Sequence, residues 1–271
     1  MTTSADTGSG RPVVLVGCGR LGSAIVEGWL YTNAVDAADL VILTPSSKPA
    51  AEAARFCGAQ INPPASVIAR ARAVVLAVKP AYWKAAVEPI AATLPGDAAI
   101  VSVMAGVRTA SLASVFSGPI ARVMPTTAVA TGQGIAAVWS ADDAARAVAH
   151  ALFGPLADVV DLDEEGHIDV ATAVAGSGPA YVHAFTRALA AAGQDAGLDA
   201  DSALRLARGA VRSAASTDPG QSLDALIARV ASPGGTTEAG LRALNKSGNL
   251  DQAIAAAVVA ALLRARELSR D

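Results

Sequence analysis

Two glycine-rich turns carry the residue types in this chain that point most directly to ligand chemistry. The first, Gly17-x-Gly19-x-x-Gly22, follows the apolar stretch PVVLVG and precedes a helix expected at 21–31. The second, SPGGTT at 232–237, stands where another helix is expected to begin. Backbone N–H groups at a helix start lack an intrahelical acceptor and lie at the positive end of the helix dipole, so both turns could bind an anion. A plain helix cap explains the second turn as well.

The first turn matches the fingerprint of a dinucleotide-binding site. Gly17 permits the tight turn, Gly19 lets a pyrophosphate approach the backbone, and Gly22 allows close packing of helix and strand. Arg20 could touch a phosphate or face solvent. The predicted contacts in this loop are Gly17, Cys18, Gly19, Arg20, Leu21 and Gly22.

The second expected strand, DLVILT at 39–44, ends without the carboxylate that usually holds the ribose 2′-hydroxyl of NAD. Asp36 and Asp39 come before the strand rather than at its end. The residues after it offer hydroxyls and one cation, which favours a 2′-phosphate and therefore NADPH over NADH; alternatively, the two serines cap the next helix. The predicted contacts are Thr44, Ser46, Ser47 and Lys48.

Two further strand ends, in LAVKP at 76–80 and VSVMAG at 101–106, belong to the sheet edge where α/β proteins bind ligands. Their position predicts contacts with the nicotinamide and its ribose. For Lys79, an exposed lysine without a ligand is an equal alternative. The predicted contacts are Val78, Lys79, Pro80, Ala105 and Gly106.

Helices alternate as far as residue 163 with seven apolar strands, which predicts an α/β Rossmann-type domain with a mostly parallel sheet. The strands are expected at 12–17, 39–44, 73–78, 98–103, 120–124, 134–139 and 159–162. Beyond residue 163 only helices are expected, so the second domain is predicted to be all-α. The expected divisions are a flexible tail at 1–11, a nucleotide-binding domain at 12–163 and a helical domain at 164–271.

The helical domain has too few charges to stand alone. From Ile168 to Gly193 the only formally charged side chains are Asp169 and Arg187. A helix that is apolar nearly all round must be covered, and a domain of about 100 residues can hardly bury several such helices itself. We therefore expect a homodimer through these helices, with a higher oligomer built from dimers left open. The alternative is that alanine-rich helices need less cover.

Composition excludes several other functions. The net charge of −3 and the lack of a basic run argue against nucleic acid, and the longest apolar run, 253–263, is too short to span a membrane. Two cysteines without metal-like spacing, and a start without the apolar core of a signal peptide, predict a cytoplasmic protein. Neither a metal cluster nor an evident nucleophile is expected. Hydride transfer fits, because its hard step belongs to the cofactor.

Residues 13–268 resemble the pyrroline-5-carboxylate reductases. The segments GCGRLGSAI, LAVKP, VAGSGPAYV and ASPGGTTEAGLRAL occur in the order and spacing of that family, and the last two are highly specific. The resemblance implies a Rossmann domain followed by a helical domain that interlocks with a partner subunit. Active sites in the family form where one subunit's cofactor domain meets the shared helical layer. The implied reaction is reduction of L-1-pyrroline-5-carboxylate to L-proline by NADPH, the final step of proline biosynthesis.

The resemblance also assigns the second turn. It implies that the substrate carboxylate rests on the amides of Gly235, Thr236 and Thr237, with the Thr237 hydroxyl near the ring nitrogen as the catalytic group. The implied substrate contacts are Ser232, Gly234, Gly235, Thr236 and Thr237. Where the family commonly reads Met-Pro-Asn-Thr-Pro, this chain has Thr126 and Ala128 at the third and fifth positions. A family contact through asparagine is therefore not expected here.

Two other readings are kept. One is another NADP-dependent imine reductase or 3-hydroxyacid reductase of similar layout. Hydroxyacid enzymes of this layout use a lysine on the long helix after the domain boundary, and the helix expected at 179–196 contains no lysine. The other is a non-catalytic NADPH-binding regulator, which the intact SPGGTT turn argues against.

Overall fold

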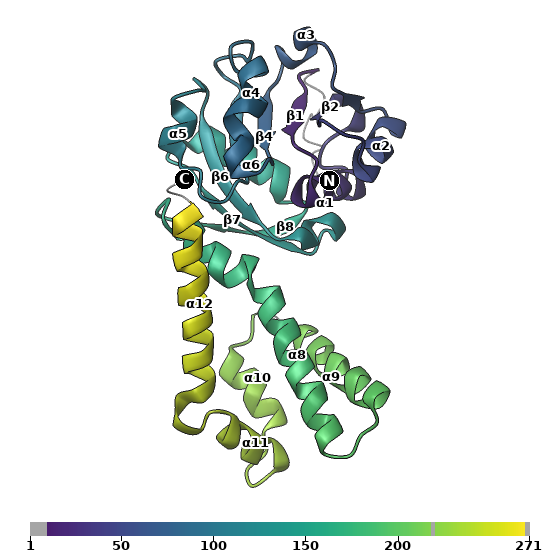
Figure 1. Ribbon diagram of the computed structural model, residues 1–271, viewed down its shortest axis with the longest axis vertical. Coiled ribbons are helices and arrows are strands. Elements are labelled where there is room, and N and C mark those ends of the chain that lie inside the picture. Colours follow the sequence, from purple (N-terminus) through teal and green to yellow (C-terminus); the bar gives the residue numbers. More distant parts are fainter. Residues whose placement is uncertain (1–9, 218–219, 269–271) are drawn as a thin grey trace, which may run out of the picture. The chain divides into compact units, whose positions relative to one another are not determined.

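The computed structural model describes residues 10–217 and 220–268, and these form two compact units (Figure 1). The first unit comprises the chain up to Gly176 and from Leu262 onward, and the second comprises Ser177–Ala261. Most of the tail predicted at 1–11 lies outside the described residues. Arg11, at its end, is held rather than loose: its guanidinium lies 2.7 Å from an Asp97 oxygen and donates to the Ala71 carbonyl at 3.0 Å.

An eight-stranded sheet forms the centre of the first unit, with the order β3-β2-β1-β4-β5-β6-β7-β8. All neighbours pair in parallel except β6 and β7, so the predicted mostly parallel sheet is confirmed. Of the eight strands only β3 was not predicted, because a two-residue strand leaves no pattern in the sequence. The strands are β1 (Val13–Val16), β2 (Leu40–Leu43), β3 (Gln60–Ile61), β4 (Ala73–Leu76), β5 (Ala99–Ser102), β6 (Ile120–Pro125), β7 (Gly134–Trp139) and β8 (Ala157–Asp161).

Both faces of this sheet are covered by helices. Val13 and Leu15 of β1 pack in one core with α1, α2 and α6, whereas Val14 and Val16 pack in another with α3, α4 and α5. Alternate residues of a strand point to opposite faces, which explains why the strands are apolar throughout rather than alternating. The helices are α1 (Arg20–Thr32), α2 (Pro49–Phe56), α3 (Ala65–Ile68), α4 (Trp83–Ala91), α5 (Thr109–Ala113), α6 (Asp143–Phe153) and α7 (His167–Ala171).

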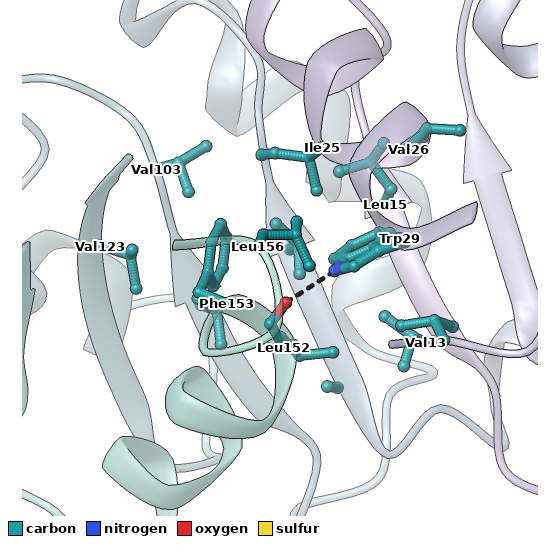
Figure 2. Close-up of a cluster of buried hydrophobic side chains, with 14 of the residues drawn as sticks. Val13, Leu15, Ile25, Val26, Trp29, Val103, Val123, Leu152, Phe153 and Leu156 are labelled. Carbon is teal, nitrogen blue, oxygen red and sulfur yellow. Dashed lines mark hydrogen bonds between the residues drawn. The ribbon is translucent and has the colours of Figure 1, made fainter. Parts of the chain in front are cut away.

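Trp29 ties α1 to α6 across the first of these cores (Figure 2). Its indole is fully buried, and its Nε1 donates a 2.8 Å hydrogen bond to the carbonyl of Leu152 in the last turn of α6. Carbonyls in the last turn of a helix lack intrahelical donors, so this bond satisfies a group that burial would otherwise leave unpaired. The contact fixes α1, the helix that follows the glycine turn, against the body of the unit.

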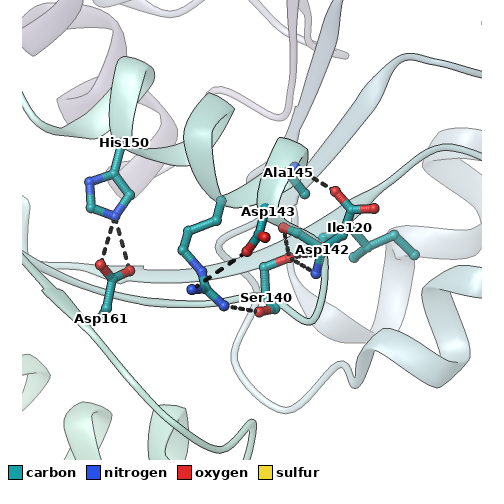
Figure 3. Close-up of polar contacts among 8 residues, drawn as sticks. Ile120, Ser140, Asp142, Asp143, Ala145, His150 and Asp161 are labelled. Atoms are coloured by element: carbon teal, nitrogen blue, oxygen red, sulfur yellow. Dashed lines mark hydrogen bonds and ion pairs between the residues drawn. The ribbon is translucent and has the colours of Figure 1, made fainter.

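A hydrogen-bonded turn after β7 fixes the end of this antiparallel strand to the start of β6 and leads into α6 (Figure 3). The Ser140 hydroxyl, buried after β7, donates to the Ile120 carbonyl at 2.7 Å, and Arg146 donates to the Ser140 carbonyl at 2.6 Å. Asp142 then caps α6 by accepting from the Ala145 amide at 2.9 Å. On the same helix, His150 Nε2 lies 2.9 Å from Asp161 of β8.

Ion pairs with a buried arginine hold α7 and the residues just before it to strand β6. Arg122 of β6 is 1% exposed, and its guanidinium lies 3.3 Å from Glu165 and 3.9 Å from Asp169. Arg108 adds a 2.8 Å contact to the other Asp169 oxygen. Burial lowers the pKa of Arg122, while the two carboxylates oppose that shift. The first compact unit includes α7 and a π-helical turn at Thr172–Gly176, and the domain boundary at 163–164 stays a prediction.

Only helices occur among the described residues of the second unit, which confirms the predicted all-α character. They are α8 (Gly178–Asp195), α9 (Ala200–Ala215), α10 (Leu223–Val230), α11 (Thr236–Leu244) and the part of α12 (Asn249–Leu268) up to Ala261. Helices α8 and α9 bury two residues each, and α10 and α11 bury none. Across the described parts of both units, no helix has the length and apolar character needed to cross a membrane.

Candidate functional site

The glycine turn between β1 and α1 has the shape that a dinucleotide requires. Gly17 has a φ of +96°, and a Cβ there would come within 2.7 Å of Val78. A Cβ on Gly22 would come within 2.1 Å of the Gly17 carbonyl oxygen. Gly19 is different, because its φ of −76° suits any residue and a Cβ would meet nothing within 4 Å. The protein itself thus needs glycine at 17 and 22, while the open space over Gly19 suits an approaching phosphate.

The first turn of α1 leaves its amides available. Gly19 is the N-cap and has no side chain to cap the helix, and the first intrahelical bond runs from the Ser23 amide to the Gly19 carbonyl at 2.8 Å. Within the described part of the chain, the amides of Arg20, Leu21 and Gly22 have no acceptor. Cys18 is 2% exposed and can offer only its backbone, whereas Arg20 is exposed. These are the groups that would hold a pyrophosphate.

The end of β2 presents hydroxyls, as predicted, but not equally. Thr44 is 7% exposed and its hydroxyl donates to the Ser46 carbonyl at 2.9 Å, so Thr44 shapes the loop from within. Ser46 and Ser47 are exposed and Lys48 is partly exposed. Asp36 instead caps a 3₁₀ turn before β2, accepting from Ala38 at 2.9 Å.

Sequence reasoning missed one carboxylate near this strand end. Glu52, in the first turn of α2, accepts from the Ser47 hydroxyl at 3.1 Å and forms a 2.9 Å ion pair with Arg55. The position of Ser47 just before α2, five residues ahead of Glu52, could have indicated the contact. The paired Arg55 offsets the charge of Glu52, so the carboxylate does not by itself exclude a phosphate from the loop.

The remaining predicted nucleotide contacts follow neighbouring strands. Val78 is half-buried beside Gly17, and Lys79 is exposed. Ala105 is exposed, and Gly106 has a φ of +79°. Since β2, β1, β4 and β5 are consecutive and parallel, the loops that follow them leave from the same edge of the sheet. The first unit thus gathers all four predicted segments at one edge.

The second glycine turn is held by its own bonds. Gly234 has a φ of +71°, and its amide donates to a Glu238 carboxylate oxygen at 2.6 Å. The Gly235 amide, one of the three amides that the resemblance assigns to the substrate carboxylate, donates to the Ser232 carbonyl at 2.9 Å and is not open in this structure. A Cβ on Gly235 would lie 2.5 Å from the Ser232 hydroxyl oxygen, which explains the glycine.

The amides that remain open in this turn lie one residue further on. Gly235 caps α11 without a side chain, and in the described structure the amides of Thr236, Thr237 and Glu238 have no acceptor. Thr236 and Thr237 are exposed in the isolated chain. An uncapped helix start with free amides and two hydroxyls is suited to a small carboxylate.

No cluster of three or more metal-binding side chains occurs in residues 10–217 and 220–268. Thr126, at the position where the resemblance led us to expect no asparagine contact, is 8% exposed and its hydroxyl accepts from the Ile135 amide at 3.2 Å. That hydroxyl therefore joins β6 to β7.

Comparison with known proteins finds a matching family model in each half of the chain. Residues 165–268 match a family described as pyrroline-5-carboxylate reductase dimerisation, and residues 12–106 match NADP oxidoreductase, coenzyme F420-dependent. The pyrroline-5-carboxylate reductase of Pseudomonas aeruginosa is 32% identical over 95% of this chain and 96% of its own length. That of Pisum sativum is 36% identical over 94% of each chain. The crystal structure of Plasmodium falciparum pyrroline carboxylate reductase with NADP bound has the same fold, with a TM-score of 0.80 over 96% of this chain and 98% of its own, at 24% identity.

Alanine at positions 19 and 22 should separate nucleotide binding from folding. Gly19→Ala meets no protein atom, so the melting temperature should stay unchanged while affinity for NADPH falls about tenfold or more, because the added methyl occupies the phosphate's place. Gly22→Ala should lower stability by roughly 1–3 kcal/mol through its clash with Gly17. Fluorescence titration and thermal melting measure the two effects.

Gly96→Ala is the matched control, because Gly96 precedes β5 at the opposite edge of the sheet and also has open space for a Cβ. It should change neither quantity. Normal NADPH affinity in Gly19→Ala would mean that no phosphate lies over this glycine.

Proposed function

Since the chain belongs to the pyrroline-5-carboxylate reductase family, we propose that it reduces L-1-pyrroline-5-carboxylate to L-proline with NADPH, the final step of proline biosynthesis. The observation that carries the proposal is the pairing of two anion seats in a chain related to such reductases over 95% of its length. The first unit offers a dinucleotide turn, and the second offers free amides for a small carboxylate.

The substrate carboxylate binds at the start of α11 in this proposal. The open amides of Thr236 and Thr237, with that of Glu238 beside them, donate to its oxygens. Each charge-assisted hydrogen bond contributes about 1.5–3 kcal/mol. Gly234 and Gly235 shape the turn rather than contact the substrate through their amides, and Ser232 holds Gly235 in place. Fixing the carboxylate also orients the ring, and orientation is a large part of the rate enhancement.

The reaction needs little from ionisable side chains. When bound, NADPH supplies the hydride that adds to the imine carbon. The ring nitrogen carries the proton that balances this addition, and a cyclic imine is readily protonated in water. A strong general acid is therefore unnecessary, and the Thr237 hydroxyl serves by hydrogen bonding near the ring nitrogen and orienting it. The exposure of Thr237 at the helix start supports this role.

The nucleotide seat is proposed to consist of the four loops at the carboxyl edge of the sheet. The amides at 20–22 hold the pyrophosphate, and Ser46, Ser47 and Lys48 hold the 2′-phosphate that distinguishes NADPH from NADH. The loops at 78–80 and 105–106 line the nicotinamide end. Support comes from the open space over Gly19 and from the exposed hydroxyls after β2.

The second unit is proposed to form a homodimer through its helices, and a larger assembly of dimers is compatible with it. Its apolar side chains are poorly covered within one chain: Leu223 is 77% exposed, Ile227 46% and Val230 69%. Such a surface is costly in water and marks a protein contact. We also propose a cytoplasmic location, because Cys57 is an exposed free thiol, which a reducing compartment preserves.

The substrate assignment is tested by initial rates. Purified protein should oxidise NADPH rapidly with pyrroline-5-carboxylate, more slowly with NADH in its place, and barely with 3-oxo acids. Comparable or faster turnover of 3-oxo acids would favour a hydroxyacid reductase instead. Binding of NADPH without turnover of any imine would favour a regulator.

Removing the Thr237 hydroxyl should slow reduction of the imine without changing the affinity for NADPH. In Thr237→Ala, kcat/KM for the imine should fall about tenfold or more, if a hydrogen bond worth ~1.4 kcal/mol in the transition state is lost, while the Kd for NADPH stays unchanged. Thr237→Ser keeps the hydroxyl and should retain most activity. Unchanged kinetics in Thr237→Ala would mean that the hydroxyl takes no part in catalysis and that Thr237 only begins the helix.

A charge on α10 should disrupt assembly and folding of the second unit together. Ile227→Asp would cost less than about 0.5 kcal/mol if this side chain faced water. In a dimer it should instead abolish the dimer and much of the helical circular dichroism, because the helices lack cover. Ala85→Asp, an exposed alanine on α4, is the control and should alter neither. Light scattering and circular dichroism check this, and a well-folded monomer would contradict it.

A further inference from the structure

Asn62, which neither the sequence analysis nor the proposed mechanism uses, makes an unusual set of bonds with the end of β2. Its Nδ2 donates to the Thr44 carbonyl at 2.8 Å, and its Oδ1 accepts from the Thr44 amide at 3.0 Å. Its own amide donates to the Ile42 carbonyl at 3.0 Å. Its φ is +47°, and only two other non-glycine residues in the described chain, Asn33 and Ser247, have a positive φ.

The carboxamide of Asn62 takes the place of a strand residue. β3 pairs with β2 only through Val41–Gln60 and Ile42–Ile61, and the chain then turns away at Asn62. Thr44 is 7% exposed, so its backbone groups would be poorly hydrated without a partner. A carboxamide holds one donor and one acceptor in a plane, as a peptide group does, and can satisfy both. Asparagine also tolerates the left-handed backbone that aims it there.

Thr44 is the residue from which the proposed 2′-phosphate loop departs. Its hydroxyl donates to the Ser46 carbonyl at 2.9 Å, which sets the path of the following residues. The Ser47 hydroxyl is aimed in turn at Glu52 of α2 at 3.1 Å. The loop therefore has one fixed point at α2 and another at Thr44, and the second depends on Asn62.

We infer that Asn62 is a positioning residue that sets the preference of this protein for NADPH over NADH. It holds the end of β2 so that Ser46, Ser47 and Lys48 face the 2′-phosphate, and it contacts no part of the nucleotide itself. The inference rests on the proposed nucleotide seat. It predicts that losing the carboxamide loosens the 2′-phosphate contacts, while the pyrophosphate turn at 17–22, which Asn62 does not touch, is unaffected.

Asn62→Gly tests this inference, because glycine accepts the positive φ and removes only the carboxamide. The dissociation constants of NADPH and NADH are measured by nicotinamide fluorescence without substrate, since the two nucleotides differ only in the 2′-phosphate. NADPH affinity should fall about fivefold or more, as expected for lost hydrogen bonds, while NADH affinity changes less than about twofold. Asn62→Ser, whose short side chain cannot make both bonds, should shift the ratio in the same direction and serves if the glycine variant is poorly folded.

Asn33→Gly is the matched control. Asn33 is also a left-handed asparagine, at the C-cap of α1, so this variant repeats the backbone change away from β2 and should leave both affinities unchanged. An equal loss for both nucleotides, or an unchanged ratio in a folded Asn62 variant, would overturn the role of Asn62. Equal binding of NADPH and NADH by the wild type would overturn the proposed 2′-phosphate seat, and with it the inference. Neither outcome depends on whether pyrroline-5-carboxylate is the substrate.

Discussion

Both proposed ligand seats depend on one constraint: the first backbone N–H groups of a helix have no carbonyl acceptor within that helix. Several helices of this chain satisfy those groups with their own side chains: Asp142 caps α6, Asp199 caps α9 and Ser222 caps α10. α1 and α11 begin with glycine instead, and their first amides stay open. A glycine cap adds no acceptor of its own, so an anion can take the place that a side chain occupies elsewhere.

The same glycines make these seats rigid as well as open. At the first turn, Gly17 and Gly22 are required by contacts within the protein, and the fixed backbone leaves space only over Gly19. At the second, the Glu238 carboxylate and the Ser232 carbonyl take the amides of Gly234 and Gly235, so the turn has its shape before any substrate arrives. A preformed seat lowers the ordering cost of binding, which suits a reaction in which the protein mainly positions its reactants.

The two units differ in how far one chain can complete them. The first has a buried core on each face of its sheet, and these cores fully enclose large side chains such as Trp29 and Leu112. The second buries few side chains and leaves leucine, isoleucine and valine exposed along α10. The unit that carries the proposed carboxylate seat is therefore also the unit whose exposed apolar side chains the proposed homodimer would cover.

Patterns between near neighbours were enough to predict most elements of the fold. Continuous apolar strands, helical stretches and the glycine spacing of 17, 19 and 22 each reflect local geometry, and so they predicted seven of the eight strands and the dinucleotide turn. The homology of the SPGGTT turn likewise directed attention to the start of α11.

What the sequence alone determined was therefore the order of the elements, the position of the glycine turns and the lack of charge that calls for a partner. Tertiary structure decided which amides are free, because Gly235 loses its amide to Ser232 only once the turn closes. It also decided how the segment around α7 is held to the sheet, since Glu165, two residues before that helix, contacts Arg122 across 43 residues of chain. The contact of Asn62 with Thr44 is of the same kind: 18 residues separate them, and only the pairing of β3 with β2 brings a carboxamide to a strand end. Polar contacts between distant residues produce no periodic pattern in the sequence, because they form only where the fold brings the two segments together.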